Sequence, residues 1–262
     1  MRVLSLAPSG TEPRRVRALE RAQAEARLLR AAGHEVWLAT PQRTHAGERS
    51  ALAFVREDRL PDHWHKSRDP GCERALTDAV RALGIELVHV HHWQGLSRSL
   101  VLAAARAGVP AVVSLHDAWI ACPIGSRVRP AIGACDSVVG AHPCLACAAE
   151  TGPRTPWVPM EQSFLALAER QRDLQRELEL ARVRWITSHE LALRLERWFG
   201  APVRAEPMFE PELEPLVAGY RAALVQGAPQ VAAEEWFGAR MQAEAQRSWD
   251  LQYDRARAQS EA

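Results

Sequence analysis

The sequence predicts an α/β protein in which a doubly wound parallel sheet is followed by a helical tail. Two observations lead to this fold class. Short runs rich in Val, Leu and Ile alternate with longer segments whose apolar residues recur at steps of three and four, which is typical of strands and helices respectively. Glycines follow several of the longer segments, where the end of a helix favours a left-handed backbone. Such alternation indicates parallel strands joined by helical crossovers.

The first βαβ unit occupies the start of the chain. Residues 2–7 (RVLSLA) predict a strand, residues 14–32 a helix that ends at Gly33, and residues 35–39 (EVWLA) a second strand. The crossover between the two strands is expected to be right-handed. The next predicted elements are a short strand at 52–55, a helix at 72–83, a strand at 87–90, a helix at 97–107 and a strand at 109–115.

The regular alternation stops at residues 118–160, a long stretch rich in proline and cysteine. Loops of this length inside compact domains are usually functional or held by something extra. The later predicted elements are a helix at 162–181, a strand at 183–186, a helix at 188–199, a strand at 202–207 and helices at 214–225 and 230–258. We therefore divide the chain into a sheet domain at 1–207, with residues 118–160 as a loop insertion, and a helical tail at 208–262.

Composition excludes several classes of function. The chain has 33 basic and 32 acidic residues, and this balance gives no electrostatic reason to bind nucleic acid. No apolar run reaches the roughly 18 residues of a membrane span, and the N-terminus resembles a strand more than a signal peptide. We expect a cytoplasmic protein without a transmembrane segment, and peripheral contact with a membrane stays open.

Polar side chains directly follow two of the predicted strands. His91 and His92 come after the strand at 87–90, and His116 and Asp117 come after the strand that ends at Leu115. The carboxyl ends of parallel strands share one edge, so these side chains are expected to meet in the ligand-binding crevice.

A third histidine lies inside the strand. Alternation places His89 on the same face as His91, with His92 on the opposite face, and His89 is best explained as a packing residue. A metal site in this VHVHH run is not favoured, because no acidic ligand stands near it in the sequence.

Four cysteines of the long loop form the set Cys122-x12-Cys135-x8-Cys144-x2-Cys147. A C-x2-C pair is a common half of a tetrahedral zinc site, so we expect a structural zinc, ahead of an iron–sulfur cluster. His142 is a further ligand that would replace one cysteine. The alternatives are a disulfide or free thiols.

The segments MRVLSLAPSG, LLRAAGHEVWLATP, VHVHHWQGLS, VPAVVSLHDAWIACP and VRWITSHELALRLERWFG together resemble the N-terminal domain of family 4 glycosyltransferases of the GT-B fold. The resemblance extends over residues 1–207, and the cysteines after the His-Asp pair are similar to those of one subgroup. It implies a Rossmann-like domain that holds the acceptor. It also implies catalytic roles for His116 and Asp117 beside the transferred sugar, with His91 and His92 on the acceptor side.

The loop after the first strand departs from the family. Many members carry a Gly-Gly pair there, whose amides approach the donor phosphates, whereas this chain has only Gly10. Arg14 and Arg15 either meet those phosphates instead or form a solvated helix start. Trp119 either stacks on a sugar ring or belongs to the core.

The resemblance implies transfer of a sugar from a nucleotide-sugar donor to an unknown acceptor. Residues 208–262 are expected to be too few for a donor-binding domain, although the segment RSWDLQYDRARAQ resembles the helix that returns to the N-terminal domain in such enzymes. We therefore expect a partner chain to supply the donor-binding domain. The alternative is a non-catalytic binding or scaffold protein derived from such a domain, so the sequence leaves open whether the chain is an enzyme.

Overall fold

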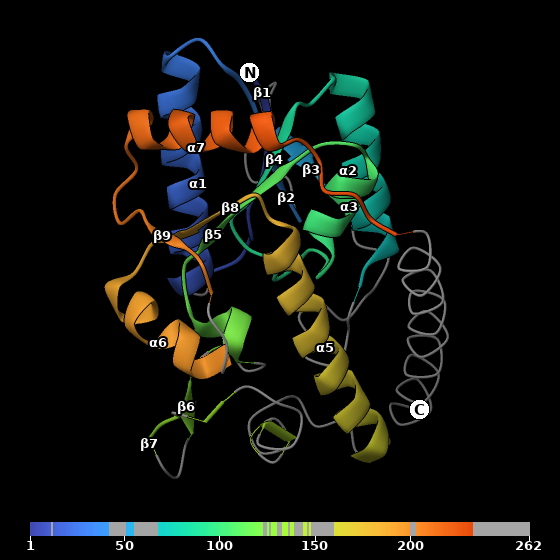
Figure 1. Cartoon of the computed structure of the whole chain (residues 1–262), viewed down its shortest axis with the longest axis vertical. Helices are drawn as coiled ribbons and strands as arrows, with labels where there is room; N and C mark the ends of the chain where they lie inside the picture. Colours follow the sequence, from blue (N-terminus) through green and yellow to red (C-terminus); the bar gives the residue numbers. More distant parts are fainter. Residues whose placement is uncertain are drawn as a thin grey trace.

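The computed structural model describes residues 1–11, 13–41, 51–54, 68–122, 160–199 and 203–232, together with single positions between 125 and 147. Its centre is a seven-stranded sheet in which every neighbouring pair is parallel (Figure 1). In spatial order the strands are β3 (Ala51–Ala53), β2 (Glu35–Thr40), β1 (Arg2–Leu6), β4 (Leu87–Val90), β5 (Ala111–Leu115), β8 (Val183–Ile186) and β9 (Glu206–Pro207). The predicted Rossmann-like α/β fold is confirmed.

The helices follow the predicted segments closely. They are α1 (Pro13–Ala31), α2 (Pro70–Leu83), α3 (Leu100–Arg106), α5 (Met160–Leu180), α6 (His189–Phe199) and α7 (Leu213–Gln226), with a 3-10 turn η1 (Ala118–Ala121) and a small antiparallel hairpin of β6 (Val128–Arg129) and β7 (Gly133–Ala134). Some predicted elements are shorter than expected: the helix at 97–107 begins at Leu100, the strand at 109–115 begins at Ala111, and only Glu206–Pro207 of the strand at 202–207 is assigned as a strand. The helix predicted at 230–258 lies almost entirely outside the described residues.

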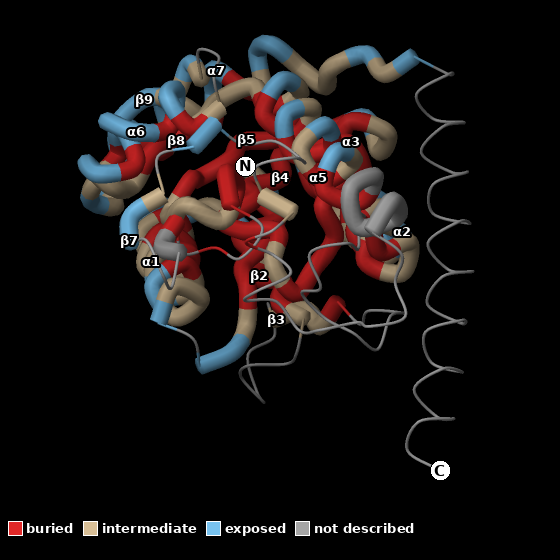
Figure 2. Tube along the Cα trace, turned by 90° about the horizontal axis from the view of Figure 1, so that it is seen from below, coloured by how far each residue is buried: buried red, intermediate tan, exposed pale blue. Residues whose placement is uncertain are grey.

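The two faces of the sheet are covered by different helices. On one face, Val88 and Val90 of β4 pack with apolar residues of α2, α3, α5 and α6. On the other face, Val3 and Leu87 pack with α1 and α7. Figure 2 shows the central strands as the buried interior, with exposed positions on the outer helices and on the short strands β7 and β9. Because helices cover both faces of the sheet, β5 is buried at every position, and a strand of this kind needs an almost entirely apolar sequence.

The tail helix α7 is part of the core. Tyr220 and Leu216 are buried against Trp185 of β8, and α7 crosses α1 on the same face of the sheet (Figure 1). Gly219 makes this close approach possible, because a Cβ atom there would come within 2.4 Å of the Trp185 ring. The helix therefore extends the layer begun by α1 over β4, β5 and β8.

The strand order reverses between β1 and β4, which is the topological switch point of the sheet. The first chain segment leaves β1 toward β2, and the later strands continue from β4 in the opposite direction. The backbone amide of His91 donates to the carbonyl of Leu6 over 2.8 Å, so the ends of β1 and β4 stay side by side. Ligands of such sheets bind at the carboxyl edge near this point.

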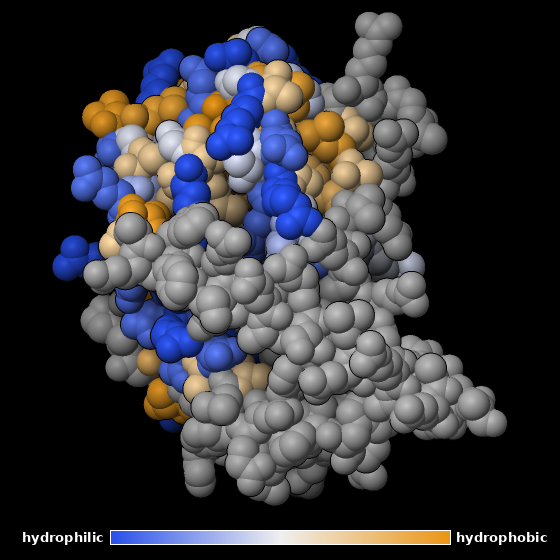
Figure 3. All heavy atoms as spheres, turned by 90° about the vertical axis from the view of Figure 1, so that its right-hand side faces the viewer, coloured by the Kyte–Doolittle hydropathy of each residue, from blue (hydrophilic) through white to orange (hydrophobic). Residues whose placement is uncertain are grey.

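No helix within the described ranges is long and apolar enough to span a membrane. The described surface on the face in Figure 3 accordingly mixes hydrophilic and hydrophobic residues.

Candidate functional site

The carboxyl edge of β4, β5 and β8 brings the sequence-predicted polar residues together. His91 Nδ1 lies 3.3 Å from His116 Nε2, and the two rings are stacked with centroids 5.5 Å apart. On the other side of the strands, His92 Nε2 lies 3.6 Å from Asp117 Oδ2. Alternation along the chain therefore produces two adjacent pairs, one from each face.

Both ring nitrogens of the half-buried His116 are engaged inside the protein. Its Nδ1 lies 3.1 Å from the hydroxyl of Thr187, which itself donates to the carbonyl of Leu115. That hydroxyl must accept from His116, so the proton of the neutral ring sits on Nδ1 and Nε2 is an acceptor facing His91. Burial, with the charges of His92 and Arg21, lowers the pKa of His116 to about 3, so the ring is neutral at pH 7.

One carboxylate oxygen of Asp117 is buried and unpaired among the described residues. Its Oδ1 accepts from the backbone amide of Trp119 over 2.7 Å and caps η1, while Oδ2 has no hydrogen-bond partner among the described residues. Burial by itself would raise the pKa of Asp117, but the nearby His92 side chain, the hydrogen bond from the Trp119 amide and the charge of Arg14 together lower it. The side chain is therefore an ionised acceptor at neutral pH.

His92 presents a proton to this carboxylate. Its Nδ1 accepts from the backbone amide of Gln94 over 2.9 Å, so the proton of the neutral ring lies on Nε2, which faces Asp117. A donor and an acceptor stand side by side here, the combination that a hydroxyl group needs because it both donates and accepts.

Trp119 is packed beside the Asp117 pair. The guanidinium of the buried Arg170 lies 4.5 Å from the Trp119 ring centroid, and the ring of His92 lies 5.2 Å from it. Arg170 also donates to the carbonyls of Trp119 and Cys122, which ties α5 to η1. The half-buried Trp119 thus has partners of its own within the chain.

The loop after β1 is held by its own arginines. Gly10 has a φ of +125°, a conformation that side chains rarely adopt, and the Arg15 side chain folds back beside it with Nη1 3.3 Å from the Ser9 carbonyl. Arg14 donates to the carbonyl of Gly125. Both arginines predicted to meet phosphates make contacts within the chain.

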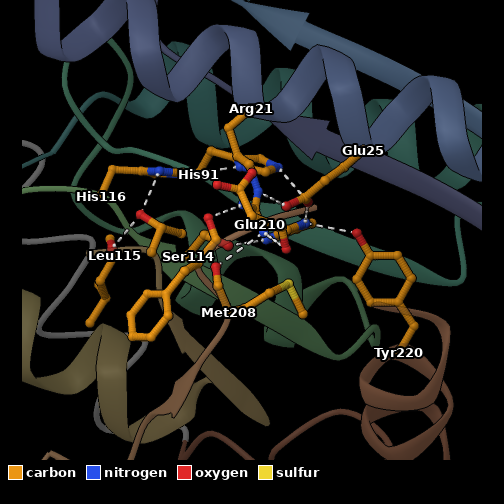
Figure 4. Close-up of polar contacts among 12 residues, drawn as sticks. Arg21, Glu25, His91, Ser114, Leu115, His116, Met208, Glu210 and Tyr220 are labelled. Atoms are coloured by element: carbon orange, nitrogen blue, oxygen red, sulfur yellow. Dashed lines mark hydrogen bonds and ion pairs between the residues drawn. The ribbon is translucent and has the colours of Figure 1, made fainter. Parts of the chain in front are cut away.

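A buried pair from α1, Arg21 and Glu25, was not found by sequence reasoning. Figure 4 shows both side chains extending from α1 toward the histidines, with Tyr220 entering from α7. Glu25 is 1% exposed and is ion-paired with Arg21, and its Oε2 lies 3.5 Å from His89 Nδ1 and 3.7 Å from His91 Nε2. The expectation that no acidic group lies near the VHVHH run is therefore wrong, because the fold brings Glu25 of α1 next to His89 and His91. One sequence signal was available: Glu25 falls beside Ala22 and Ala26 on the apolar face of its helix.

Arg21 has a second function in the fold. It donates to the carbonyls of Met208, Phe209 and Glu210, with distances from 2.9 to 3.2 Å. These residues follow β9 and lead into α7, so one guanidinium holds the tail segment against α1. His89, completely buried, joins the same layer through Tyr220 at 2.7 Å and Ser114 at 2.9 Å, which fits the packing role expected for it.

The four loop cysteines do not converge among the residues that the structure describes. Cys122 and Cys147 are buried, Cys135 and Cys144 are half-buried, and none of them is in a disulfide. In the described ranges the one set of three ligand atoms within 4.8 Å of each other belongs to Glu25, His89 and His91. Much of the surrounding loop lies outside the described residues, so the zinc site stays a prediction.

A separate hollow of about 660 Å³ lies between β8, β9 and α7. Arg184, Arg204 and Trp185 are among the residues that line it, and it contains none of the predicted site residues. The candidate site is therefore at the carboxyl edge and not at this flank of the sheet.

The fold and the polar edge define a class of protein: a Rossmann-like domain with a donor–acceptor pair beside its switch point. The comparison with protein families is more specific, because the model described as Glycosyltransferase Family 4 matches residues 21–140. This stretch contains Glu25, His91, His92, His116 and Asp117, and it is similar to a glycosyltransferase family 4 domain of the N-terminal type. No curated protein matches the chain.

Proposed function

We propose that this domain is the acceptor half of a glycosyltransferase and binds a hydroxyl-bearing acceptor, such as a sugar, at the carboxyl edge beside Asp117. The observation that carries the proposal is the buried Oδ2 of Asp117, which has no hydrogen-bond partner among the described residues and lies 3.6 Å from His92 Nε2, next to the switch point of the sheet. A sugar hydroxyl would donate to the carboxylate and accept from the imidazole. The family 4 match supports sugar transfer as the reaction.

In this reaction the acceptor oxygen forms a bond to the anomeric carbon of a nucleotide sugar. The bond from that carbon to the diphosphate breaks, the nucleoside diphosphate leaves with the electron pair, and the proton of the acceptor hydroxyl passes to the departing diphosphate. Asp117 is ionised because His92 and neighbouring donors lower its pKa, so it orients the hydroxyl by accepting its hydrogen bond. His116 holds its neighbours in place, since both of its ring nitrogens are bound within the protein.

We propose that the donor-binding domain comes from a partner chain. The described residues form one seven-stranded sheet and the small β6–β7 hairpin. The loop after β1 carries Gly10 with the Arg15 side chain folded beside it, an arrangement that gives diphosphate little access to backbone amides. A second Rossmann-like domain would then supply the main phosphate contacts.

Acceptor binding is tested with Asp117→Asn. Asparagine retains an oxygen for the Trp119 amide but has no carboxylate to accept the acceptor hydroxyl, so affinity for the acceptor is expected to fall about tenfold to a hundredfold. The matched control is Asp78→Asn, an exposed position on α2. Binding is measured by calorimetry against a panel of simple glycosides, with chemical-shift mapping to locate the contact.

The outcome decides between an enzyme and a scaffold. Transfer activity is assayed with nucleotide sugars in the presence of candidate partner chains that contain a lone donor-binding domain. Equal glycoside binding by both variants would contradict the assigned site. If the protein binds no glycoside and shows no transfer activity with any partner, the result would instead favour the non-catalytic scaffold.

A further inference from the structure

The buried residues below the site form one continuous row of polar contacts, and each contact fixes where a proton can lie. The row begins at the carbonyl of Leu115, which can only accept, so Thr187 donates to it. Thr187 then accepts from His116 Nδ1, as described above. His116 Nε2 is left as an acceptor, and His91 Nδ1 must therefore carry a proton and donate to it across 3.3 Å.

The next atom in the row has no donor. With its proton on Nδ1, a neutral His91 presents a bare Nε2, and this atom faces Glu25 Oε2 at 3.7 Å. Neither atom has a hydrogen-bond partner among the described residues, although both are buried. If Glu25 were ionised, two acceptors would face each other in an apolar interior, which is costly because neither would be satisfied.

The neighbouring groups do not supply the missing proton. Arg21 directs its Nε to the other carboxyl oxygen of Glu25 and its two terminal nitrogens to the carbonyls of residues 208–210. His89 and Tyr220 are bonded to each other, and His89 also contacts Ser114. In either tautomer of His89, the Nε2 atom of His91 still lacks a donor.

A water molecule does not fit between the two atoms. Two ordinary hydrogen bonds meeting at a tetrahedral oxygen span roughly 4.6 Å, which exceeds the observed separation. A proton held directly between Glu25 and His91 needs them about 0.5 Å closer than the observed 3.7 Å, and the attraction of the hydrogen bond favours that approach.

We propose that Glu25 is a neutral carboxylic acid in the folded protein and donates its proton from Oε2 to His91 Nε2. This bond completes the row from α1 to β8 and fixes the tautomers of both His91 and His116. Glu25 is thus a positioning residue for the histidines at the carboxyl edge. The proposal concerns the proton alone and stands whether or not the domain transfers a sugar.

The electrostatics around Glu25 agree with this assignment. Burial raises the pKa of Glu25 to about 7, even though the charge and hydrogen bond of Arg21 act in the opposite direction. Burial also keeps His89 and His91 well below their ordinary pKa, with Arg21 and the other histidines adding to the effect. Burial raises the pKa of Tyr220 on α7 well above its ordinary value, so this side chain stays neutral. The proton therefore resides on the carboxyl group and not on an imidazole.

A metal ion suits the same atoms less well. The positive guanidinium of Arg21 is bonded to Glu25, and the Nδ1 of His89 is already 2.7 Å from the Tyr220 hydroxyl. A divalent ion would add two positive charges beside Arg21 in an almost completely buried place, which is unfavourable.

The test compares Glu25→Gln with Glu20→Gln, an exposed position one turn earlier on α1. Infrared spectra are recorded near pH 6, about one unit below the pKa of Glu25, with and without 13C-labelled glutamate. The wild type and the Glu20 variant are expected to show a carboxylic acid C=O band that shifts on labelling. Burial also raises the pKa of Glu177 to about 7, so a second labelled band can come from that residue. Glu25→Gln is expected to remove the Glu25 component and to leave any Glu177 component in place.

Imidazole 15N spectra test the tautomers. Glutamine also donates to His91 Nε2 and accepts from Arg21, so Glu25→Gln should retain the Nδ1-protonated forms of His91 and His116. Glu25→Ala should lose them, and if this variant does not fold, the glutamine variant and the infrared band still decide. A carboxylate signal from Glu25 at this pH, an imidazolium at His91, or a stoichiometric metal that Glu25→Gln removes would each overturn the proposal.

Discussion

At the scale of single residues, three histidines and one aspartate meet at the carboxyl edge of the sheet and differ in how they are bonded within the protein. His91, His92, His116 and Asp117 lie where strand ends predicted them, at one edge of the sheet. Which of them has an unpaired atom depends on neighbours distant in sequence. His116 contacts Thr187, which directly follows β8, whereas Oδ2 of Asp117 is buried with no hydrogen-bond partner among the described residues. No spacing rule contains that distinction.

The stability of the protein should respond to Glu25 as pH changes. Its folded pKa of about 7 lies above the ordinary value of 4.5, so its contribution is fully present below pH 4.5 and is lost as pH rises through 7. The lost contribution amounts to about 3 kcal/mol of unfolding free energy. The depressed pKa of His116 acts oppositely, because its contribution is present above pH 6.5 and is lost as pH falls toward 3.

Glu25→Gln removes the pH dependence of stability that comes from Glu25. The variant is therefore expected to gain about 3 kcal/mol relative to the wild type between pH 4.5 and 8, measured by urea unfolding at a series of pH values. Glu20→Gln serves as the control and should follow the wild type. A difference between Glu25→Gln and wild type that stays constant with pH would contradict the assignment.

At the scale of elements, the sequence predicted the position of α7, but only the fold shows which residues of the helix are buried and what they pack against. Periodicity placed a helix at 214–225, and the structure places it at Leu213–Gln226. The same segment contributes Leu216, Tyr220 and Ala223 to the core. Its partner surface is built from α1, β4, β5 and β8, which a local pattern cannot identify.

Gly219→Ala tests this packing. Helix propensity alone predicts that alanine stabilises α7 by about 1 kcal/mol. The Trp185 ring lies 2.4 Å from the position of the new Cβ, so we expect a loss of about 2 kcal/mol instead. Thermal unfolding and the near-ultraviolet signal of Trp185 report the change. Val225→Ala, at an 89% exposed position of the same helix, is the control, and stabilisation by Gly219→Ala would contradict the contact.

The cysteine loop is the second element whose prediction can be measured directly. If Cys122, Cys135, Cys144 and Cys147 hold a structural zinc, protein purified without chelator should contain about one zinc per chain by elemental analysis. Cys144→Ser with Cys147→Ser should remove the metal and lower the melting temperature. Cys72→Ala, outside the set, should retain the metal. A zinc content near zero in reduced wild-type protein would contradict the prediction.

At the scale of the whole molecule, the strand order creates the site. The reversal between β1 and β4 leaves the carboxyl ends of these strands beside each other, and the polar residues after β4 and β5 stand at that edge. Arg21 then joins the segment after β9 to α1, so the first helix and the tail share one layer. This layer buries Glu25 and the histidines together.

The sequence by itself determined the alternation of strands and helices, most element boundaries and the residues that follow each strand. These follow from short-range periodicity and backbone preferences, which are local properties. Only the tertiary structure brought Glu25 of α1 to His91, closed both ring nitrogens of His116 and placed Tyr220 of α7 against His89. Such contacts join residues up to 131 positions apart, and their energies depend on burial, which is a property of the packed layers.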